Sequence, residues 1–189
     1  MDSIATTCAA IERSDMQCRQ QATERLAQLT MPHWAMGRLL DLAVDLAGMT
    51  GRLDPLVSRR TIVVMAGDHG VTRQGVSQYP AEVTAQMVRN FAAGGAAINA
   101  MVHTANSKLV VVDMGVAGDL QDLVAAGAIL DRRVAAGTAD LSLGPAMSVE
   151  QARSSVLSGI RLADELASAV DLFGTGEMGI GNTTPSAAI

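Results

Sequence analysis

The stretch that decides the fold is TIVVMAGDHG, residues 61–70. Its first part is a continuous apolar or β-branched run, and its second part is a Gly-Asp-His-Gly segment. A short apolar run without polar alternation is typical of a strand buried on both faces, as in a parallel sheet. We therefore predict a strand over 61–66 that ends in a loop at 67–70.

The same design occurs twice more along the chain. LVVVDMG (109–115) and VDLF (170–173) are apolar runs that each lead into a glycine-bearing segment. Helical patterns separate the runs at 80–92, 96–103 and 148–167, the last opening on the capping-box sequence SVEQ (148–151). Strands alternating with helices predict an α/β fold, a parallel sheet with right-handed crossover helices in a Rossmann-like three-layer arrangement. In such folds ligands bind at the carboxyl ends of the strands.

The N-terminal part of the chain has a different character. Residues from about 3 to 29 are polar with apolar residues at helical spacing, which predicts one or two peripheral helices. After a Pro-containing break at 31–33, a clearer helix is predicted from near Trp34, stopped by Gly48 and Gly51. We expect a helical segment over 1–50 and an α/β nucleotide-binding core over 51–189.

Composition excludes several classes of protein. The chain has 189 residues, of which 49% are hydrophobic and 2% aromatic, and its formal net charge is −5. An acidic chain with so few aromatic rings suits neither a phosphate-backbone binder nor a single-stranded nucleic-acid platform. The two cysteines lack CxxC spacing, which argues against a disulfide framework or a zinc site.

The chain shows neither a signal peptide pattern nor an apolar run of membrane-spanning length. The first residues, MDSIATTCAA, have no basic start and no sustained apolar stretch. A membrane span needs roughly 18 consecutive apolar residues. We predict a cytoplasmic protein with small-molecule partners and with neither nucleic acid nor a membrane as partner.

The most informative segment is GTGEMGIGNTTP, residues 174–185. We predict a glycine-rich loop after a strand, followed by a helix with Thr184 as N-cap and Pro185 at its first position. Glycines allow a ligand to approach the backbone closely, and a helix N-terminus favours an anion, so a phosphate is the expected ligand. A flexible connector is the plain alternative. Interpretation of this segment as a dinucleotide-binding fingerprint is less well supported, because no acidic residue follows about 20 positions later. A Walker A loop is excluded, because the chain has no GK[ST] sequence.

Other side chains near these loops are candidates for a site. Asp68 and His69 suit a metal or acid–base pair less well than a turn fixed by Asp68 and its flanking glycines. Ser77, Tyr79 and Gln86 offer neutral hydrogen bonds to a flat heterocycle. Glu177 lies inside the anion-friendly segment, where it would contact a ribose hydroxyl or a cationic ring, or else be a solvated surface charge.

Four motifs together resemble one family. GDHGV (67–71), GVSQYPAEVTAQMVRNFAAGGAAIN (75–99), VVVDMGV (110–116) and GEMGIGNTTPSAA (176–188) are similar to the nicotinate-nucleotide:dimethylbenzimidazole phosphoribosyltransferases of cobalamin lower-ligand synthesis. RVAAGTAD (133–140) adds weaker support. The chain departs from the family at MPHWAMG (31–37), where a Pro-Gly-Ser-Leu-Gly sequence is common.

The resemblance implies a reaction and a set of residues. A benzimidazole nitrogen attacks C1′ of nicotinate mononucleotide, nicotinate leaves, and α-ribazole 5′-phosphate forms with inversion, without a metal or organic cofactor. By resemblance, Ser77, Tyr79 and Gln86 match the aromatic-base pocket, and Glu177 matches a loop glutamate of the active site. The residues that match the phosphate and ribose loop are Gly176, Gly179, Gly181, Asn182, Thr183 and Thr184. Relatives suggest a homodimer.

The resemblance also places the principal general-base glutamate beyond residue 189. Residues 185–189 make only the first turn of a helix, and an isolated helix needs about 12 residues. We therefore expect the N-terminal part of a phosphoribosyltransferase, with little or no turnover by this chain alone. The alternatives are a non-catalytic nucleotide-phosphate binding module and a nicotinamide-dinucleotide oxidoreductase.

Overall fold

The computed structural model describes residues 4–189, which divide into two compact units, one ending at Val57 and the other running from Ser58 to Ile189. We call them the helical unit and the α/β unit. Within residues 4–189, none of the helices combines the length and the apolar character needed to cross a bilayer.

The helical unit contains α1 (Ile4–Ala9), α2 (Met16–Ala27) and α3 (Arg38–Thr50). Asp15 caps α2, because its carboxylate accepts the backbone N–H of Cys18 at 2.9 Å. Helices α2 and α3 pack through a small apolar cluster made of Cys18, Ala22, Val44 and Ala47. The predicted helices of this segment are therefore present.

The boundaries of α3 differ from those predicted. The helix begins at Arg38 rather than near Trp34, because Trp34 (φ 49°) and Gly37 (φ 51°) have left-handed backbone that interrupts a helix. Gly48 does not stop it but lies buried within it, where an added Cβ would approach the Arg19 side chain to 2.4 Å. Gly51 ends the helix in the left-handed conformation, as predicted.

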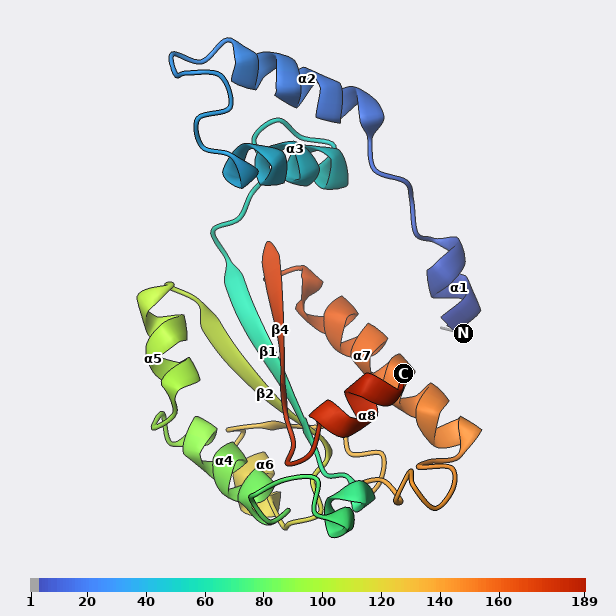
Figure 1. Cartoon of the computed structure of the whole chain (residues 1–189). Coiled ribbons are helices and arrows are strands. Elements are labelled where there is room, and N and C mark those ends of the chain that lie inside the picture. The colour runs from blue at the N-terminus through green and yellow to red at the C-terminus, as the bar shows by residue number, and fades with distance from the viewer. Residues whose placement is uncertain (1–3) are drawn as a thin grey trace. The chain divides into compact units, whose positions relative to one another are not determined.

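A parallel sheet forms the centre of the α/β unit. Its strands are β1 (Arg60–Gly67), β2 (Lys108–Gly115), β3 (Leu130–Asp131) and β4 (Leu172–Met178), in the spatial order β3-β2-β1-β4 (Figure 1). The predicted strands at 61–66 and 109–115 are confirmed as β1 and β2. Sequence analysis missed β3, because two residues are too short to show a periodic pattern.

The third predicted strand is longer than expected. Instead of ending at Phe173, β4 continues to Met178 and pairs with β1 up to the Ala66–Met178 register. Gly174 and Gly176 lie inside the strand, where an added Cβ would approach the side chains of Ile62 to 2.4 Å and Val64 to 3.1 Å. These glycines therefore serve close strand packing rather than a loop.

Helices cover both faces of the sheet, as the three-layer prediction required. Helices α4 (Val83–Ala92), α5 (Ala97–Thr104) and α6 (Gln121–Ala125) accompany one face, and α7 (Val149–Ala167) lies on the other (Figure 1). A 3-10 helix, η1 (Gly70–Gln74), follows β1, and α8 (Thr183–Ala188) follows β4. Ser148 opens α7 with the predicted capping box.

Alternation along β1 assigns its side chains to the two faces. Val64 and Ala66 belong to the cluster that includes Val88 and Phe91 of α4, so we call this side the α4 face. Val63 packs with Leu162 of α7, with Met65 against the same cluster, so we call the other side the α7 face. Further members of the α4-face cluster are Ala96, Val111, Val116, Leu120 and Ile129.

Candidate functional site

Loops from distant parts of the chain meet at the carboxyl end of β1. His69 forms an isolated parallel bridge with Thr138, Gly70 donates its N–H to Thr138 O at 3.1 Å, and Thr138 donates to Asp68 O at 3.0 Å. A Cβ on Gly70 would come within 2.6 Å of the backbone of Ala139. Glycine at position 70 is therefore required for segments 67–70 and 137–140 to lie this close.

Two buried carboxylates brace this end of the sheet. Asp68 is 7% exposed, and its Oδ2 accepts the N–H of Ala117 at 2.8 Å. The Oδ1 of Asp113 accepts the N–H groups of Gly115 at 3.0 Å and Val116 at 2.8 Å. Burial raises the pKa of Asp113, against the effect of these two backbone donors. Both carboxylates hold residues 115–117, the segment that follows β2.

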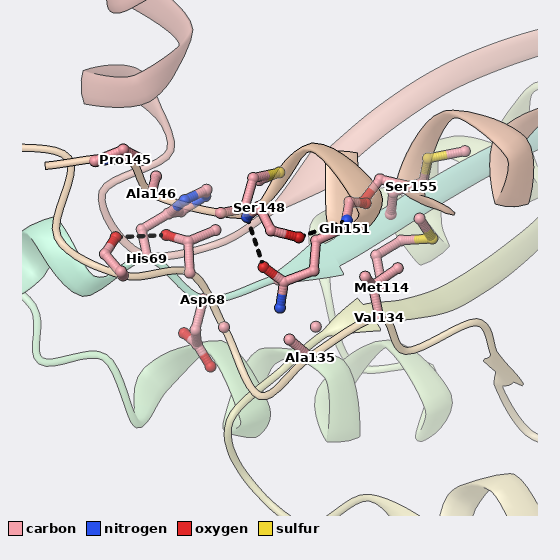
Figure 2. Close-up of a pocket in the computed structure, with 17 residues that line it drawn as sticks. Asp68, His69, Met114, Val134, Ala135, Pro145, Ala146, Ser148, Gln151 and Ser155 are labelled. Carbon is pink, nitrogen blue, oxygen red and sulfur yellow. Dashed lines mark hydrogen bonds between the residues drawn. The ribbon is translucent and has the colours of Figure 1, made fainter. Parts of the chain in front are cut away.

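The second oxygen of Asp68 is unusual, because Oδ1 is buried without a hydrogen-bond partner among residues 4–189. In Figure 2 the carboxylate of Asp68 points away from Gln151 and Ser148. Within the part of the chain described here, no group of three or more His, Cys, Asp or Glu side chains is placed to hold a metal ion.

The glycine-rich loop is shorter than predicted and is held at three points. Only residues 179–182 separate β4 from α8, so Asn182 rather than Thr184 precedes the helix, and Pro185 is its third residue. Ile180 donates its N–H to Thr84 Oγ1 at 3.0 Å, and His69 Nε2 lies 2.5 Å from Asn182 Oδ1.

Close packing of glycines provides the third attachment of this loop. A Cβ on Gly179 would come within 2.2 Å of Gly67 O, so residue 179 lies directly against the end of β1. Gly181 has a left-handed backbone (φ 83°), and a Cβ there would approach Thr72 Cγ2 to 3.0 Å. The loop is therefore fitted onto the segment 67–72.

Glu177 lies in a strand rather than in the predicted loop. It pairs with Met65 of β1, and neighbouring partners in a parallel sheet project to the same side, so Glu177 lies on the α7 face. Its side chain is exposed, because β4 is an edge strand of the described sheet. Of the six residues matched to phosphate and ribose, Gly176 is also in β4, and the others occupy the loop or α8.

A cavity of about 640 Å³ opens on the α7 face at the carboxyl ends of β1 and β2. Figure 2 shows it between these strands, the segment that precedes α7, and the first turns of that helix. Its apolar wall includes Met65, Met114, Val134, Ala135, Ala146 and Met147.

Polar side chains also line this cavity. Gln151 Oε1 accepts the N–H of Ser148 at 2.8 Å, and Gln151 donates its own N–H to Ser148 Oγ at 3.2 Å (Figure 2). Sequence analysis missed the cavity, because its walls come from short pieces of several elements and no single motif marks it.

A second cavity, of about 410 Å³, lies between the loop after β1 and residues 80–82, directly before α4. Asp68, His69, Arg73, Glu82 and Thr138 are among the residues that line it. Asp68 and His69 therefore border both cavities.

The three residues matched to the aromatic base are not enclosed. Tyr79 is 64% exposed, Gln86 lies on the exposed side of α4, and Ser77 Oγ accepts the N–H of Tyr79 at 3.2 Å. None of the three lines either cavity. The chain thus brings together segments 67–70, 137–140 and 179–182, while Tyr79 and Gln86 are exposed and Ser77 is half-buried.

Comparisons with known proteins point to one family. A family model described as Phosphoribosyltransferase matches residues 11–189. A nicotinate-nucleotide–dimethylbenzimidazole phosphoribosyltransferase of Syntrophotalea carbinolica is 60% identical over 189 residues, which are all of this chain and 54% of the relative. A protein of the same name from Desulfotalea psychrophila is 50% identical, with 53% of its length covered.

A solved structure agrees with these sequence matches. The crystal structure of the nicotinate-nucleotide–dimethylbenzimidazole phosphoribosyltransferase from Thermus thermophilus matches with a TM-score of 0.86 and 46% sequence identity. The match covers 92% of this chain and 52% of that one. The chain spans about half the length of the curated relatives it matches.

Proposed function

Because this chain belongs to the nicotinate-nucleotide–dimethylbenzimidazole phosphoribosyltransferase family, we propose that it is the N-terminal part of an enzyme of cobalamin biosynthesis. The enzyme would transfer the phosphoribosyl group of nicotinate mononucleotide to 5,6-dimethylbenzimidazole or a related base. The products would be nicotinate and α-ribazole 5′-phosphate. The observation that carries the proposal is the 60% identity over the whole chain to a relative of that name.

The chemistry suits a site built from neutral donors and a carboxylate. A ring nitrogen of the base forms a bond to C1′ while the bond from C1′ to the pyridinium nitrogen breaks, so nicotinate leaves with a neutral ring. The attacking base loses the proton of its other ring nitrogen, for which a carboxylate base is suited. We place the principal base beyond residue 189, with Glu177 in a supporting role. Positioning supplies much of the remaining rate enhancement, without a metal or organic cofactor.

We assign the subsites by resemblance. Gly176, Gly179, Gly181, Asn182, Thr183 and Thr184 would hold the phosphate and ribose. The close packing of residues 179–182 against the end of β1 supports this assignment. A loop that is already fixed presents its hydrogen-bond donors to a ligand without losing further conformational entropy. Ser77, Tyr79 and Gln86 would contact the aromatic base. The exposure of Tyr79 and Gln86 in this chain is consistent with a pocket that the remaining half of the enzyme completes.

The assay that tests the proposal measures α-ribazole 5′-phosphate and nicotinate by chromatography and mass spectrometry. We expect little or no product from the 189-residue chain alone. We expect turnover when the chain is fused to the second half of the Syntrophotalea carbinolica relative. A folded fusion that binds nicotinate mononucleotide but forms no product would contradict the proposal. Turnover by the chain alone, at the rate of the fusion, would contradict our placement of the general base.

Glu177 can be tested in the same fusion. We expect Glu177→Gln to lower turnover by about tenfold or more, while the affinity for nicotinate mononucleotide changes less, as for a group that acts on the reacting atoms. Glu12→Gln, at an exposed position of the helical unit, is the matched control. Unchanged turnover in Glu177→Gln would assign this carboxylate to a solvated surface charge.

A non-catalytic nucleotide-phosphate binding module is the second candidate. The observation that favours it is the close packing of residues 179–182, which match the phosphate and ribose loop, against the end of β1. Thermal stabilisation by nicotinate mononucleotide, in a fusion that shows no turnover, would support this module. We also propose a cytoplasmic homodimer, on the basis of the resemblance; light scattering of the fusion tests the oligomeric state.

A further inference from the structure

The contact between His69 and Asn182 joins the loop after β1 to the loop after β4. His69 is the residue after Asp68 at the end of β1, and Asn182 is the last residue before α8. The imidazole Nε2 lies 2.5 Å from the amide Oδ1, across 113 positions of sequence. Both side chains are partly buried.

The chemistry of an amide oxygen fixes the roles in this contact. Asn182 Oδ1 accepts hydrogen bonds and donates none, so this orientation of the amide requires a proton on His69 Nε2. With its oxygen engaged by His69, the amide of Asn182 turns its Nδ2, which has two N–H groups, away from the imidazole. The opposite orientation of the amide would present an acceptor at that place instead.

The surroundings leave the loop little freedom to relax. Gly179 lies against Gly67 O, and Ile180 is bound to Thr84, a side chain of α4 with 0% exposure. The loop backbone is therefore held from both β1 and α4. The hydrogen bond to His69 then decides which end of the Asn182 amide faces away from the imidazole.

We propose that His69 is a positioning residue, which orients Asn182 so that its N–H donors face an oxygen of the phosphoribosyl group. This inference rests on the proposed function, since the ligand is the nucleotide of that reaction. Phosphate and ribose oxygens share the acceptor chemistry that a donor-only group recognises. The role would make the binding of nicotinate mononucleotide depend on a histidine that does not itself touch it.

The tautomer of His69 is the first test and needs no ligand. Long-range ¹⁵N–¹H correlation spectra of the 189-residue chain at neutral pH report which ring nitrogen carries the proton. We expect Nε2 of His69 to be protonated. A neutral His69 with its proton on Nδ1 would overturn the proposal, because Asn182 would then donate to the ring and present its oxygen outward.

Binding is the second test, by calorimetry with inorganic phosphate, ribose 5-phosphate and nicotinate mononucleotide as separate probes. His69→Ala should weaken nicotinate mononucleotide binding about tenfold, the effect of one well-placed hydrogen bond. His69→Gln, which keeps an N–H donor of similar reach, should bind within about threefold of the original chain. His103→Ala, at an exposed site on α5, is the matched control and should leave affinity unchanged.

The outcomes separate the inference from the proposed function. Equal affinity of His69→Ala and the original chain, or loss in His69→Gln as large as in His69→Ala, would overturn the positioning role. Failure of the original chain to bind any probe would count against the proposed nucleotide site, while the tautomer measurement would still decide the orientation of Asn182. A loss seen with inorganic phosphate assigns Asn182 to the phosphate, and a loss confined to the sugar-containing probes assigns it to the ribose.

Discussion

The two faces of the sheet differ in how completely they are closed. On the α4 face, side chains from β1, β2, α4 and the segment before α6 form one continuous apolar cluster, with Val88 and Val116 at 0% exposure. On the α7 face the buried cluster is limited to Val63, Val112 and Leu162, and it gives way to the cavity of about 640 Å³. Phe173 and Glu177 of β4 are exposed on this side.

Within one sheet, this difference separates a face that is closed by packing from a face that has room for a ligand. A closed apolar face supplies most of the free energy of folding, because burial of apolar area is the dominant favourable contribution. The more open face carries the carboxylate of Glu177 and the methionine-lined cavity, where a packed core would leave no room for a ligand. The comparison predicts that equal truncations should cost more on the α4 face than on the α7 face.

Phe91→Ala is the largest effect we expect. Phe91 is 9% exposed and belongs to the α4-face cluster, so its removal should lower the free energy of unfolding by about 4 kcal/mol. Leu162→Ala, on the α7 face, should cost about 2 kcal/mol, at the low end for a buried leucine, because fewer buried side chains surround it. Urea unfolding followed by circular dichroism measures both values.

A closer matched pair sharpens the same comparison. Val63 and Val64 are neighbours in β1 with similar burial, but they project to opposite faces. Val64→Ala should therefore destabilise more than Val63→Ala. Equal losses of unfolding free energy in this pair would show that the two faces contribute alike, and the contrast drawn above would fail.

The sequence predicted the elements of the closed face better than those of the open edge. Continuous apolar runs mark β1 and β2, which supply Val64, Ala66 and Val111 to the closed face, because burial acts directly on residue choice. The predicted end of the third strand was wrong. Gly174 and Gly176 locally indicate a loop, but they lie inside β4, where the side chains of Ile62 and Val64 on the neighbouring strand leave no room for a Cβ. Such tertiary causes leave no local pattern.

The candidate site shows the same limit. Motifs identified the segments that meet, but their spacing along the chain gives no hint that His69 lies beside Asn182, or that Thr84 binds Ile180. The cavity on the α7 face was missed for a related reason, since its walls are common residues such as methionine, valine and alanine. Local chemistry predicts which loops matter, and only the fold shows which side chains cooperate.

Asp113→Ala should have the next largest effect, and it tests whether the carboxyl end of the sheet is braced from within. The substitution leaves the N–H groups of Gly115 and Val116 without their partner, at a cost of about 3 kcal/mol of unfolding free energy. Asp113→Asn keeps an acceptor oxygen and should cost much less, because burial already disfavours the charged form and raises the pKa of this carboxyl. Equal urea midpoints for the two variants would contradict a bracing role for the Asp113 oxygen.

Thr84→Val should have a smaller effect on stability, and it tests whether α4, on the closed face, holds the loop at residues 179–182. Valine keeps the shape of the buried side chain but cannot accept the N–H of Ile180, so we expect a loss of about 1 kcal/mol. Hydrogen exchange should show a faster rate at the Ile180 amide. Thr104→Val, whose exposed hydroxyl bonds to Ala100 O within α5, is the control and should leave that rate unchanged. An unchanged rate in Thr84→Val would show that α4 does not hold the loop.

The smallest effect on stability that we expect concerns the ion pair between Arg59 and Asp171, at the amino end of the sheet. Asp171, just before β4, accepts from Arg59 NH2 at 2.6 Å and from the Arg59 backbone at 2.8 Å, while Arg59 NH1 donates to Ser168 O at 2.8 Å near the end of α7. The Arg59 guanidinium is the main cause that lowers the pKa of Asp171 from 3.8 to about 2. The start of β4 is thus tied to both β1 and the end of α7.

A lowered carboxyl pKa stabilises the fold above the unfolded-state pKa, and this contribution disappears as the pH falls through the folded-state value. The difference in urea midpoint between the original chain and Asp171→Asn should therefore be full near pH 6 and shrink as the pH falls from about 4 to about 2. It should also shrink with added salt, because the guanidinium is exposed to solvent. Asp54→Asn, whose side chain is 87% exposed, provides the reference for a carboxylate outside the α/β unit. A difference that stayed constant across this pH range would mean that hydrogen bonds retained by asparagine, rather than charge, close the amino end of the α7 face.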